Sequence, residues 1–403
     1  MTVSTFRRAV EALPIEGPRS VGAAIASGAP GASPEDLARL TEVLAESGSF
    51  IGEPTAERID IASTGGPGSL TTLLAPLLAA SDALVSKIAV PGRPAGGIDT
   101  LGSIPGFEAE LDPSDARAVL DSCGYLHTAA GRYFCPLDAA FFDWRKDNGA
   151  QAIPELAIAS LLSKKLAAGV GRVVLDIRIG PHGNFGADPD AASNNAHRFI
   201  EVANILGIDA ICAFSGISGV AQPYIGRGEA LVALDQALSG TASGWLLRHV
   251  NNCLNLASLA RGHDASQKDV VPRGAAQVHR TMLREHGVNM HKYDQHVDRV
   301  RHADRVEIVA QATGYLQVDI EGIRRVLVDR QTNATPSEYC SFGDPCGVIL
   351  EATANDRVLS GHLLATVRDQ YNPRDLAESL GSFIGTSRAP SDLPADDILR
   401  IIR

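Results

Sequence analysis

One stretch of this chain says more about its architecture than any other: Asp60-Ile-Ala-Ser-Thr-Gly-Gly-Pro-Gly-Ser-Leu-Thr-Thr72, which leads into the apolar run Leu73 to Ala80. Its beginning is typical of a strand, its small residues of a loop, and the apolar run of a helix. Such a strand–loop–helix unit presents backbone N–H groups to an anion. Ser63, Thr64 and Thr72 add hydroxyl groups to that loop. The stretch is neither a P-loop nor GxGxxG, so an ordinary strand–turn–helix connection is the alternative interpretation.

Strand-like and helical segments alternate after this stretch. Strands are predicted for 83–90, 172–180 and 210–214, and helices for 113–123 and 188–206. This alternation predicts an α/β fold with a mainly parallel sheet that helices cover on both faces. Ligands of such sheets bind beyond the carboxyl ends of the strands. The loops at 60–72 and 180–186 both follow strands and are therefore well placed for a site.

The two ends of the chain have a different character. Ser33-Pro34-Glu35-Asp36 combines a capping serine, a proline at the first position and early acidic residues, which marks a helix start. The opening residues are accordingly expected to form short helices as far as Gly48. The segment from His302 to Gly347 predicts strands and a turn-rich stretch, and a last helix begins at Pro373.

Composition and charge exclude several functional classes. The 403 residues favour two domains, and 45% hydrophobic with 21% charged residues is ordinary for a globular protein. A net charge of −11 argues against non-specific binding to nucleic acids or acidic membranes. No apolar run reaches the roughly 18 residues of a membrane span, and the first residues lack the apolar core of a secretory signal. We therefore expect a cytoplasmic protein.

Cysteines and histidines give no sign of a metal site. The six cysteines include no CxxC pair, which favours buried or unpaired thiols in a reducing compartment over disulfides. Five of the eleven histidines lie between His279 and His302, without an HExxH motif. We predict that these histidines occupy solvated helix and loop faces rather than a metal site.

Four further motifs accompany the first stretch. They are Pro91-Gly-Arg-Pro-Ala-Gly-Gly-Ile-Asp-Thr-Leu101, Ser103-Ile-Pro-Gly-Phe107, Trp144-Arg145, and Ile158-Ala-Ser-Leu-Leu-Ser-Lys-Lys-Leu-Ala-Ala-Gly169. Together the five motifs resemble those of the thymidine phosphorylase/pyrimidine-nucleoside phosphorylase family, whose members are relatives of anthranilate phosphoribosyltransferase. The resemblance extends from about Ser33 into the C-terminal region, and this chain is identified as a divergent member.

The resemblance implies a division into three parts. These are a small α domain of residues 1–50 and 137–170, an α/β domain of residues 51–136 and 171–300, and a C-terminal α+β extension of residues 301–403. Fewer residues precede the first motif than the family leads us to expect, so the helical domain is expected to be trimmed. The family also leads us to expect a homodimer.

The resemblance also implies a base-binding set, made of Arg145, Ser160 and Lys164, with Phe142 added to it. Ser160 and Lys164 are four residues apart and so share one face of a helix. In the family the matching side chains hold a pyrimidine ring and stabilise the charge that builds on the leaving base. The alternative is a lysine pair on a solvated helix face with an unrelated arginine.

The phosphate side departs from the family pattern. Ile61 and Ala62 stand where the family has lysine and histidine, whereas Asp60 is retained. Ser63, Thr64 and Thr72 keep hydroxyl groups for an anion. Either Lys87 or Arg93 can supply a replacement cation; the alternative is that they are surface charges. His182, in the loop 180–186, is a further candidate, although a lone loop histidine is more often incidental.

Three functions follow from the resemblance. The leading hypothesis is a divergent nucleoside phosphorylase-type pentosyltransferase that cleaves or forms the N-glycosidic bond of a pyrimidine-like base, with phosphate or a phosphate-bearing acceptor. The second is a specialised glycosyl- or ribosyltransferase with another anionic acceptor, and the third is a non-catalytic nucleobase-binding homologue. The expected ligands are a nucleoside or nucleobase and inorganic phosphate as co-substrate, with no metal and no organic cofactor.

Overall fold

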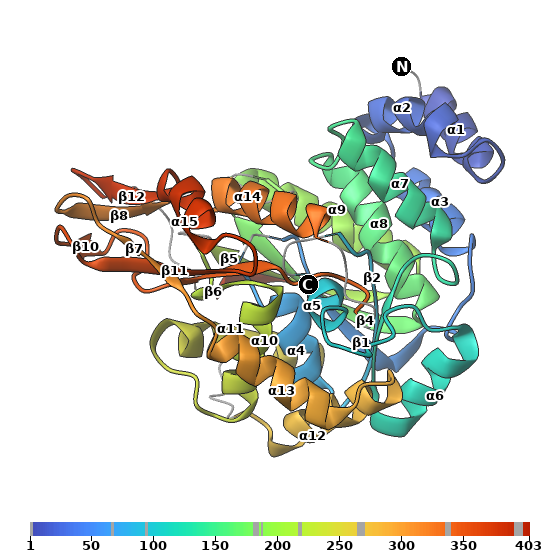
Figure 1. Ribbon diagram of the computed structural model, residues 1–403. Helices are drawn as coiled ribbons and strands as arrows, with labels where there is room; N and C mark the ends of the chain where they lie inside the picture. Colours follow the sequence, from blue (N-terminus) through green and yellow to red (C-terminus); the bar gives the residue numbers. More distant parts are fainter. Residues whose placement is uncertain are drawn as a thin grey trace.

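A six-stranded sheet forms the centre of the protein (Figure 1). The computed structural model describes residues 3–65, 68–92, 96–179, 185–186, 188–216, 220–263, 271–334, 340–390 and 398–403. The strand order is β13 (Ile398–Ile402), β5 (Asp209–Gly216), β4 (Val170–Ile179), β1 (Thr55–Ser63), β2 (Leu84–Ala89) and β3 (Tyr125–Ala129). All neighbours pair in parallel except β13, which runs antiparallel to β5. The predicted α/β class with a mainly parallel sheet is confirmed.

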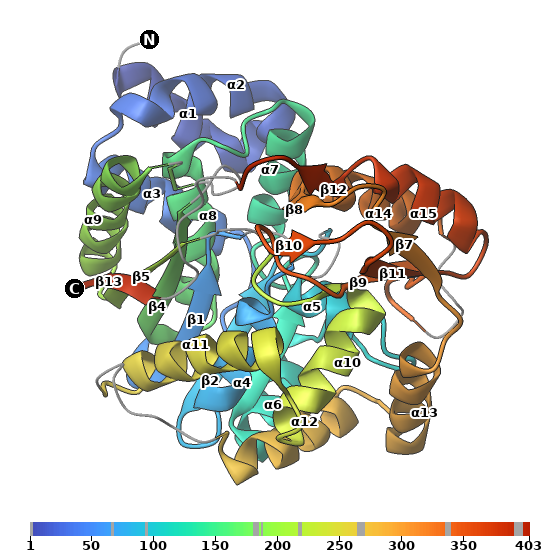
Figure 2. The ribbon, with the colours of Figure 1, turned by 90° about the vertical axis from the view of Figure 1, so that its left-hand side faces the viewer.

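Helices cover both faces of this sheet, which explains its apolar central strands. On one face lie α4 (Thr71–Ala79), α6 (Pro113–Cys123), α11 (Gly244–Ala260) and α12 (Arg273–Glu285), and on the other lie α8 (Pro154–Ala167) and α9 (Pro189–Ile205) (Figure 2). The chain builds β1, β2 and β3 outward and then returns to place β4 on the other side of β1. The carboxyl ends of β1 and β4 are therefore a switch point, where ligands of such sheets bind.

Four helices pack beside α8 and α9 at one end of the molecule. They are α1 (Val3–Glu16), α2 (Pro18–Gly28), α3 (Pro34–Ala45) and α7 (Pro136–Asp147). The predicted start of α3 is confirmed by a capping box: the Ser33 hydroxyl accepts from the Asp36 N–H, and the Asp36 carboxylate accepts from the Ser33 N–H. Within the described residues, no helix combines the length and the apolar character needed to cross a membrane.

The C-terminal part adds two small antiparallel sheets around a second hydrophobic core. One contains β10 (Arg357–Val358), β8 (Gly314–Val318) and β12 (Ile384–Ser387); the other contains β6 (Tyr224–Gly226), β9 (Cys346–Leu350), β11 (Leu363–Asp369) and β7 (Val306–Val309). α10 (Arg227–Leu238) belongs to the main hydrophobic core and contacts β6 and β9, and α13 (Met290–Arg301) packs against α10. α14 (Ile320–Asn333) and α15 (Pro373–Gly381) cover the two small sheets (Figure 1). The domain boundaries given above remain predictions.

The prediction for the histidines between His279 and His302 is wrong for three of the five. His279, His286 and His296 are buried, because α12 and α13 turn these side chains towards neighbouring elements. The His286 ring stacks on Phe107 with the ring centroids 4.4 Å apart. No group of three histidine, cysteine, aspartate or glutamate side chains that could hold a metal ion occurs in the described part of the chain. All six cysteines are free, as predicted.

Candidate functional site

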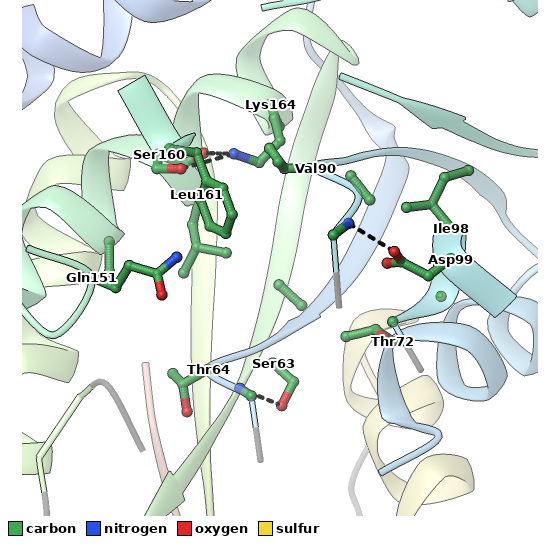
Figure 3. A pocket seen from close by; sticks show the side chains of 18 of the residues that line it. Ser63, Thr64, Thr72, Val90, Ile98, Asp99, Gln151, Ser160, Leu161 and Lys164 are labelled. Atoms are coloured by element: carbon green, nitrogen blue, oxygen red, sulfur yellow. Dashed lines mark hydrogen bonds between the residues drawn. The ribbon is translucent and has the colours of Figure 1, made fainter. Parts of the chain in front are cut away.

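A cleft of about 490 Å³ opens at the carboxyl ends of β1 and β2. Its walls come from the loop after β1, the start of α4, the short helix α5 (Gly97–Leu101), and α7, α8 and α14. Eight residues predicted from the sequence line it: Ser63, Thr64, Thr72, Lys87, Phe142, Arg145, Ser160 and Lys164. Ser160 and Lys164 lie across the cleft from Ser63 and Thr64 (Figure 3). Arg93 and His182 lie outside the described residues.

The wall formed by α7 and α8 presents the predicted base-binding set. Lys164 Nζ donates to Asp138 Oδ2 at 2.5 Å and to the Ser160 hydroxyl at 3.0 Å. Arg145 is buried and donates to the Leu156 carbonyl oxygen at 3.1 Å. Lys164 is buried as well, so the alternative of a lysine pair on a solvated face is wrong. Two cations and a hydroxyl thus converge on one side of the cleft.

Burial also sets the electrostatics of this wall. It lowers the pKa of Lys164, and the carboxylate of Asp138 opposes that shift. A charge held away from water in this way interacts strongly with a charge that develops beside it. The arrangement can therefore stabilise negative charge on a ring placed between the two helices and the loop.

The opposite wall is tied together by β4. The Ser63 hydroxyl donates to Asp176 Oδ2 at 3.0 Å, and its oxygen accepts from the Gly65 N–H at 3.3 Å. Thr64 Oγ1 accepts from the Arg178 N–H at 3.0 Å. Because Ser63 gives its only proton to a carboxylate, it is a weaker donor to an anion than the sequence predicts. Thr64 uses an acceptor position, so its own proton can go to a ligand.

A buried carboxylate holds two lysines beneath the cleft. Asp60 Oδ1 accepts from Lys87 Nζ at 3.0 Å, and Asp60 Oδ2 accepts from Lys165 Nζ. Lys87 also donates to the Ile61 carbonyl oxygen at 2.7 Å. Burial lowers the pKa of Lys87 to about 8, with Asp60 opposing the shift. The alternative of a surface charge is therefore wrong for Lys87, which stands in the cleft wall.

The cleft is rich in positive charge although the whole chain carries a net charge of −11. Among the described lining residues, the lysines and arginines outnumber the carboxylates: Lys87, Arg145, Lys146, Lys164, Lys165 and Arg324 stand against Asp99 and Glu321. Ile61 and Ala62 at the end of β1 are buried and apolar. The cations thus come from the neighbouring strand and from helices. Such a cleft attracts anionic ligands.

Sequence reasoning missed several residues that shape the site. Lys165 had a signal, because two adjacent lysines in a helix that is apolar all round cannot both face solvent. Asp176 had one too, as a charged residue inside an apolar strand. Asp138 had none, since acidic residues are common in the first turn of any helix. His127, in the buried strand β3, is considered below.

Comparisons with known proteins give sequence relatives and a similar fold. No protein-family model matches the chain. A thymidine phosphorylase of Sinorhizobium medicae (strain WSM419) is 34% identical over 183 residues, which cover 44% of this chain and 42% of that protein. A pyrimidine-nucleoside phosphorylase of Staphylococcus aureus (strain bovine RF122 / ET3-1) is 26% identical over 370 residues, which cover 87% and 84%. The match thus spans less than half of the rhizobial relative and most of the staphylococcal one.

Among solved structures, the fold is similar to that of anthranilate phosphoribosyltransferase from Thermus thermophilus. The TM-score is 0.50 at 16% sequence identity, and the match covers 75% of this chain and 96% of that one. At this identity the likeness concerns the fold alone. The sequence relatives agree with the motifs: the chain is similar to thymidine and pyrimidine-nucleoside phosphorylases at modest identity.

Proposed function

We propose that the protein is a pentosyltransferase of the nucleoside phosphorylase type. It would break or form the N-glycosidic bond between a pentose and a pyrimidine-like base, with phosphate or a phosphate-bearing molecule as the acceptor. One observation carries the proposal: a single cleft holds Arg145, Ser160 and Lys164 on one wall and the hydroxyl-bearing loop after β1 on the other. The kinship with nucleoside phosphorylases supports it.

The base would lie against α7 and α8. When the bond from C1′ to the base nitrogen breaks, its electron pair stays on the base, and Arg145 and Lys164 offset that charge. Ser160, bonded to Lys164, would orient the ring, and Phe142 would pack against it. Arg145 and Lys164 are buried, and fixed charges held away from water have their largest effect.

The acceptor would lie against β1 and β2. A phosphate oxygen forms the new bond to C1′ as the base leaves, so the sum of bonds at that carbon is unchanged. Lys87 supplies positive charge, held in place by Asp60. Thr64, Thr72 and the loop backbone supply hydrogen bonds. The proposed reaction uses inorganic phosphate as co-substrate and requires no metal or organic cofactor; the homodimer remains a prediction.

A second candidate differs in its acceptor. The apolar Ile61 and Ala62, and the bond from Ser63 to Asp176, leave fewer donors for an inorganic dianion than the motif leads us to expect. These features favour a glycosyl- or ribosyltransferase that uses another anionic acceptor. The third candidate function of the same cleft is the binding of a nucleobase without catalysis.

A phosphorolysis assay on uridine, thymidine and deoxyuridine tests the proposal. Base release should depend on inorganic phosphate, and Lys164→Met should lower kcat by about 10²–10³, the usual effect of removing one stabilising group. Circular dichroism of the variant serves as the folding control. Release only with another anionic acceptor would establish the second candidate. Base binding without release under any acceptor would contradict catalysis.

A further inference from the structure

His127 is a cleft residue to which the proposed reaction gives no role. It lies on β3, lines the cleft and is fully buried. Its Nδ1 lies 3.1 Å from the hydroxyl oxygen of Tyr125. Its Nε2 is buried and has no hydrogen-bond partner among the described residues. A polar nitrogen in that state costs free energy unless a ligand satisfies it.

The contact with Tyr125 determines which nitrogen carries the proton. Tyr125 is buried, and burial raises the pKa of its hydroxyl well above 10, so the group keeps its proton. His127 Nδ1 is the one hydrogen-bond partner that the described residues offer to this hydroxyl, so we infer that Tyr125 donates to Nδ1 and that the imidazole proton is on Nε2. Burial holds the pKa of His127 well below 6.5, and the neighbouring Lys87, His286 and Lys165 act in the same direction. His127 is thus a neutral donor through Nε2.

The strand register places this donor beside the cation of the acceptor wall. Lys87 on β2 is the parallel partner of His127 on β3, so both side chains stand on the same face of the sheet. The imidazole edge with Cε1 and Nε2 faces Gly97, another lining residue. A Cβ on Gly97 would lie 2.6 Å from Cε1 and 3.3 Å from Nε2. Only glycine leaves room for the ring there.

We propose that His127 binds the phosphate group of the ligand, its Nε2–H donating to a phosphate oxygen beside Lys87. This inference rests on the proposed function, in which phosphate enters this cleft. Donors for an anion are needed here because Ile61 and Ala62 are apolar and the Ser63 hydroxyl donates to Asp176. A lysine and an imidazole from the two next strands supply them. The same chemistry fits inorganic phosphate and a phosphate monoester.

Three variants of His127 separate a donor from a space-filling ring. Phenylalanine keeps the ring volume without a donor, and asparagine places its amide near Nδ1. Glutamine reaches the position of Nε2. In calorimetric titrations with inorganic phosphate, H127F and H127N should bind about tenfold more weakly than wild type, as expected for a lost hydrogen bond to a charged group. H127Q should keep most of the affinity.

A second titration with ribose 5-phosphate identifies the source of the phosphate group. Whichever compound loses affinity in H127F but not in H127Q is the ligand that His127 contacts. Uracil binding in the same variants should be unchanged, because the base wall belongs to α7 and α8. A general loss of structure would weaken uracil and phosphate together, so this ligand is the internal control.

A further test measures the wild-type protein itself and does not depend on the affinity of a variant. In protein labelled with ¹⁵N-histidine, the His127 ring should show a protonated Nε2, and that N–H resonance should shift when phosphate is added. The signal is assigned by its absence from H127Q or, failing that, by its Tyr125 neighbour. The inference is overturned if H127F binds both phosphate compounds as tightly as wild type does, or if phosphate leaves the His127 resonance unmoved. Phosphate-dependent base release would then leave the proposed function intact; absence of both base release and phosphate binding overturns the two together.

Discussion

Asp60 shows how one residue can shape a site without touching a ligand. Its carboxylate is completely buried and is shared by two ammonium groups, Lys87 from β2 and Lys165 from α8. Buried charges persist in proteins only when they are paired. One negative and two positive charges leave the trio with a net positive charge at the cleft. Asp60 is therefore a positioning residue for cations, although the sequence made it a candidate for the site itself.

The titration of Lys87 should appear in the binding of phosphate. Burial, together with Lys165 and Lys164, lowers its pKa to about 8, and Asp60 acts in the opposite direction. The free protein therefore loses this positive charge as the pH rises through about 8. Phosphate affinity should be highest below that pH and fall up to about tenfold per pH unit above it.

Calorimetric titrations from about pH 6.5 to about pH 9.5 measure this dependence. Lys87→Met should bind phosphate weakly at every pH and lack the fall near pH 8. The variant also corrects for the titration of phosphate itself, because both proteins meet the same phosphate ions. A wild-type profile that matches the Lys87→Met profile in shape would contradict this assignment of the cation.

At the scale of elements, local signals predicted the structure well. The helix predicted for 113–123 has the bounds of α6, and the serine and acidic residues of Ser33-Pro34-Glu35-Asp36 form the capping box of α3. Caps, prolines and apolar periodicity act over a few residues, so a sequence displays them directly. The loop after β1 and the start of α4 were predictable for the same reason.

The partners of the charged residues were not predictable in this way. Lys164 and Lys165 are adjacent in α8, yet one pairs with Asp138, 26 residues away, and the other with Asp60, 105 residues away. Such contacts depend on how helices and strands meet. The buried His279 was missed although the sequence displays it: it lies four residues after Ala275 and three before Met282, on the apolar face of α12.

The ion pair of Asp138 and Lys164 joins α7 to α8. Its removal should lower both the free energy of unfolding and the affinity for the base. Both side chains are buried. Asp138→Asn keeps the volume but leaves the Lys164 charge uncompensated, which should cost about 3–5 kcal/mol of folding free energy. Uracil affinity should fall as well, because Lys164 loses the carboxylate that holds it.

The double variant Asp138→Asn/Lys164→Met is the matched control for this prediction. It removes both charges, so it should recover much of the lost stability without recovering uracil binding. Urea denaturation and calorimetry measure the two quantities separately. Additive losses of stability in the two single variants would contradict a coupled pair.

The whole molecule shows why the C-terminal part matters to the cleft. β6, from the middle of the chain, pairs with β9. β13 returns from the C-terminal region to the edge of the main sheet, beside β5 (Figure 2). α14 brings Glu321 and Arg324 to the cleft wall. The cleft is therefore built by elements from most of the chain, and its shape depends on how firmly they are joined.

A buried network of ion pairs connects two of these elements, α10 and β11. Glu229 on α10 accepts from Arg368 of β11 at 2.8 and 2.9 Å and from Arg305 at 2.9 Å. Arg368 also donates to Asp344 at 2.9 Å. Burial opposes ionisation of Glu229, but the two arginines together lower its pKa. The network thus holds β11 of the second core against a helix of the main domain.

Arg368→Met should therefore destabilise the protein by about 3–5 kcal/mol, because Glu229 and Asp344 lose a buried counter-charge. Arg301 is the matched control: its ion pairs with Asp235 and Asp298 are largely exposed, so Arg301→Met should cost less than about 1 kcal/mol.

The two tryptophans of the chain report the transition from separate places, Trp144 in α7 and Trp245 beside the second core. Single-tryptophan versions with urea denaturation should place the Trp245 transition of Arg368→Met at lower urea than the Trp144 transition, because the second core loses its attachment first. Coincident transitions, with a loss of unfolding free energy no larger than that of Arg301→Met, would show that other contacts attach the second core.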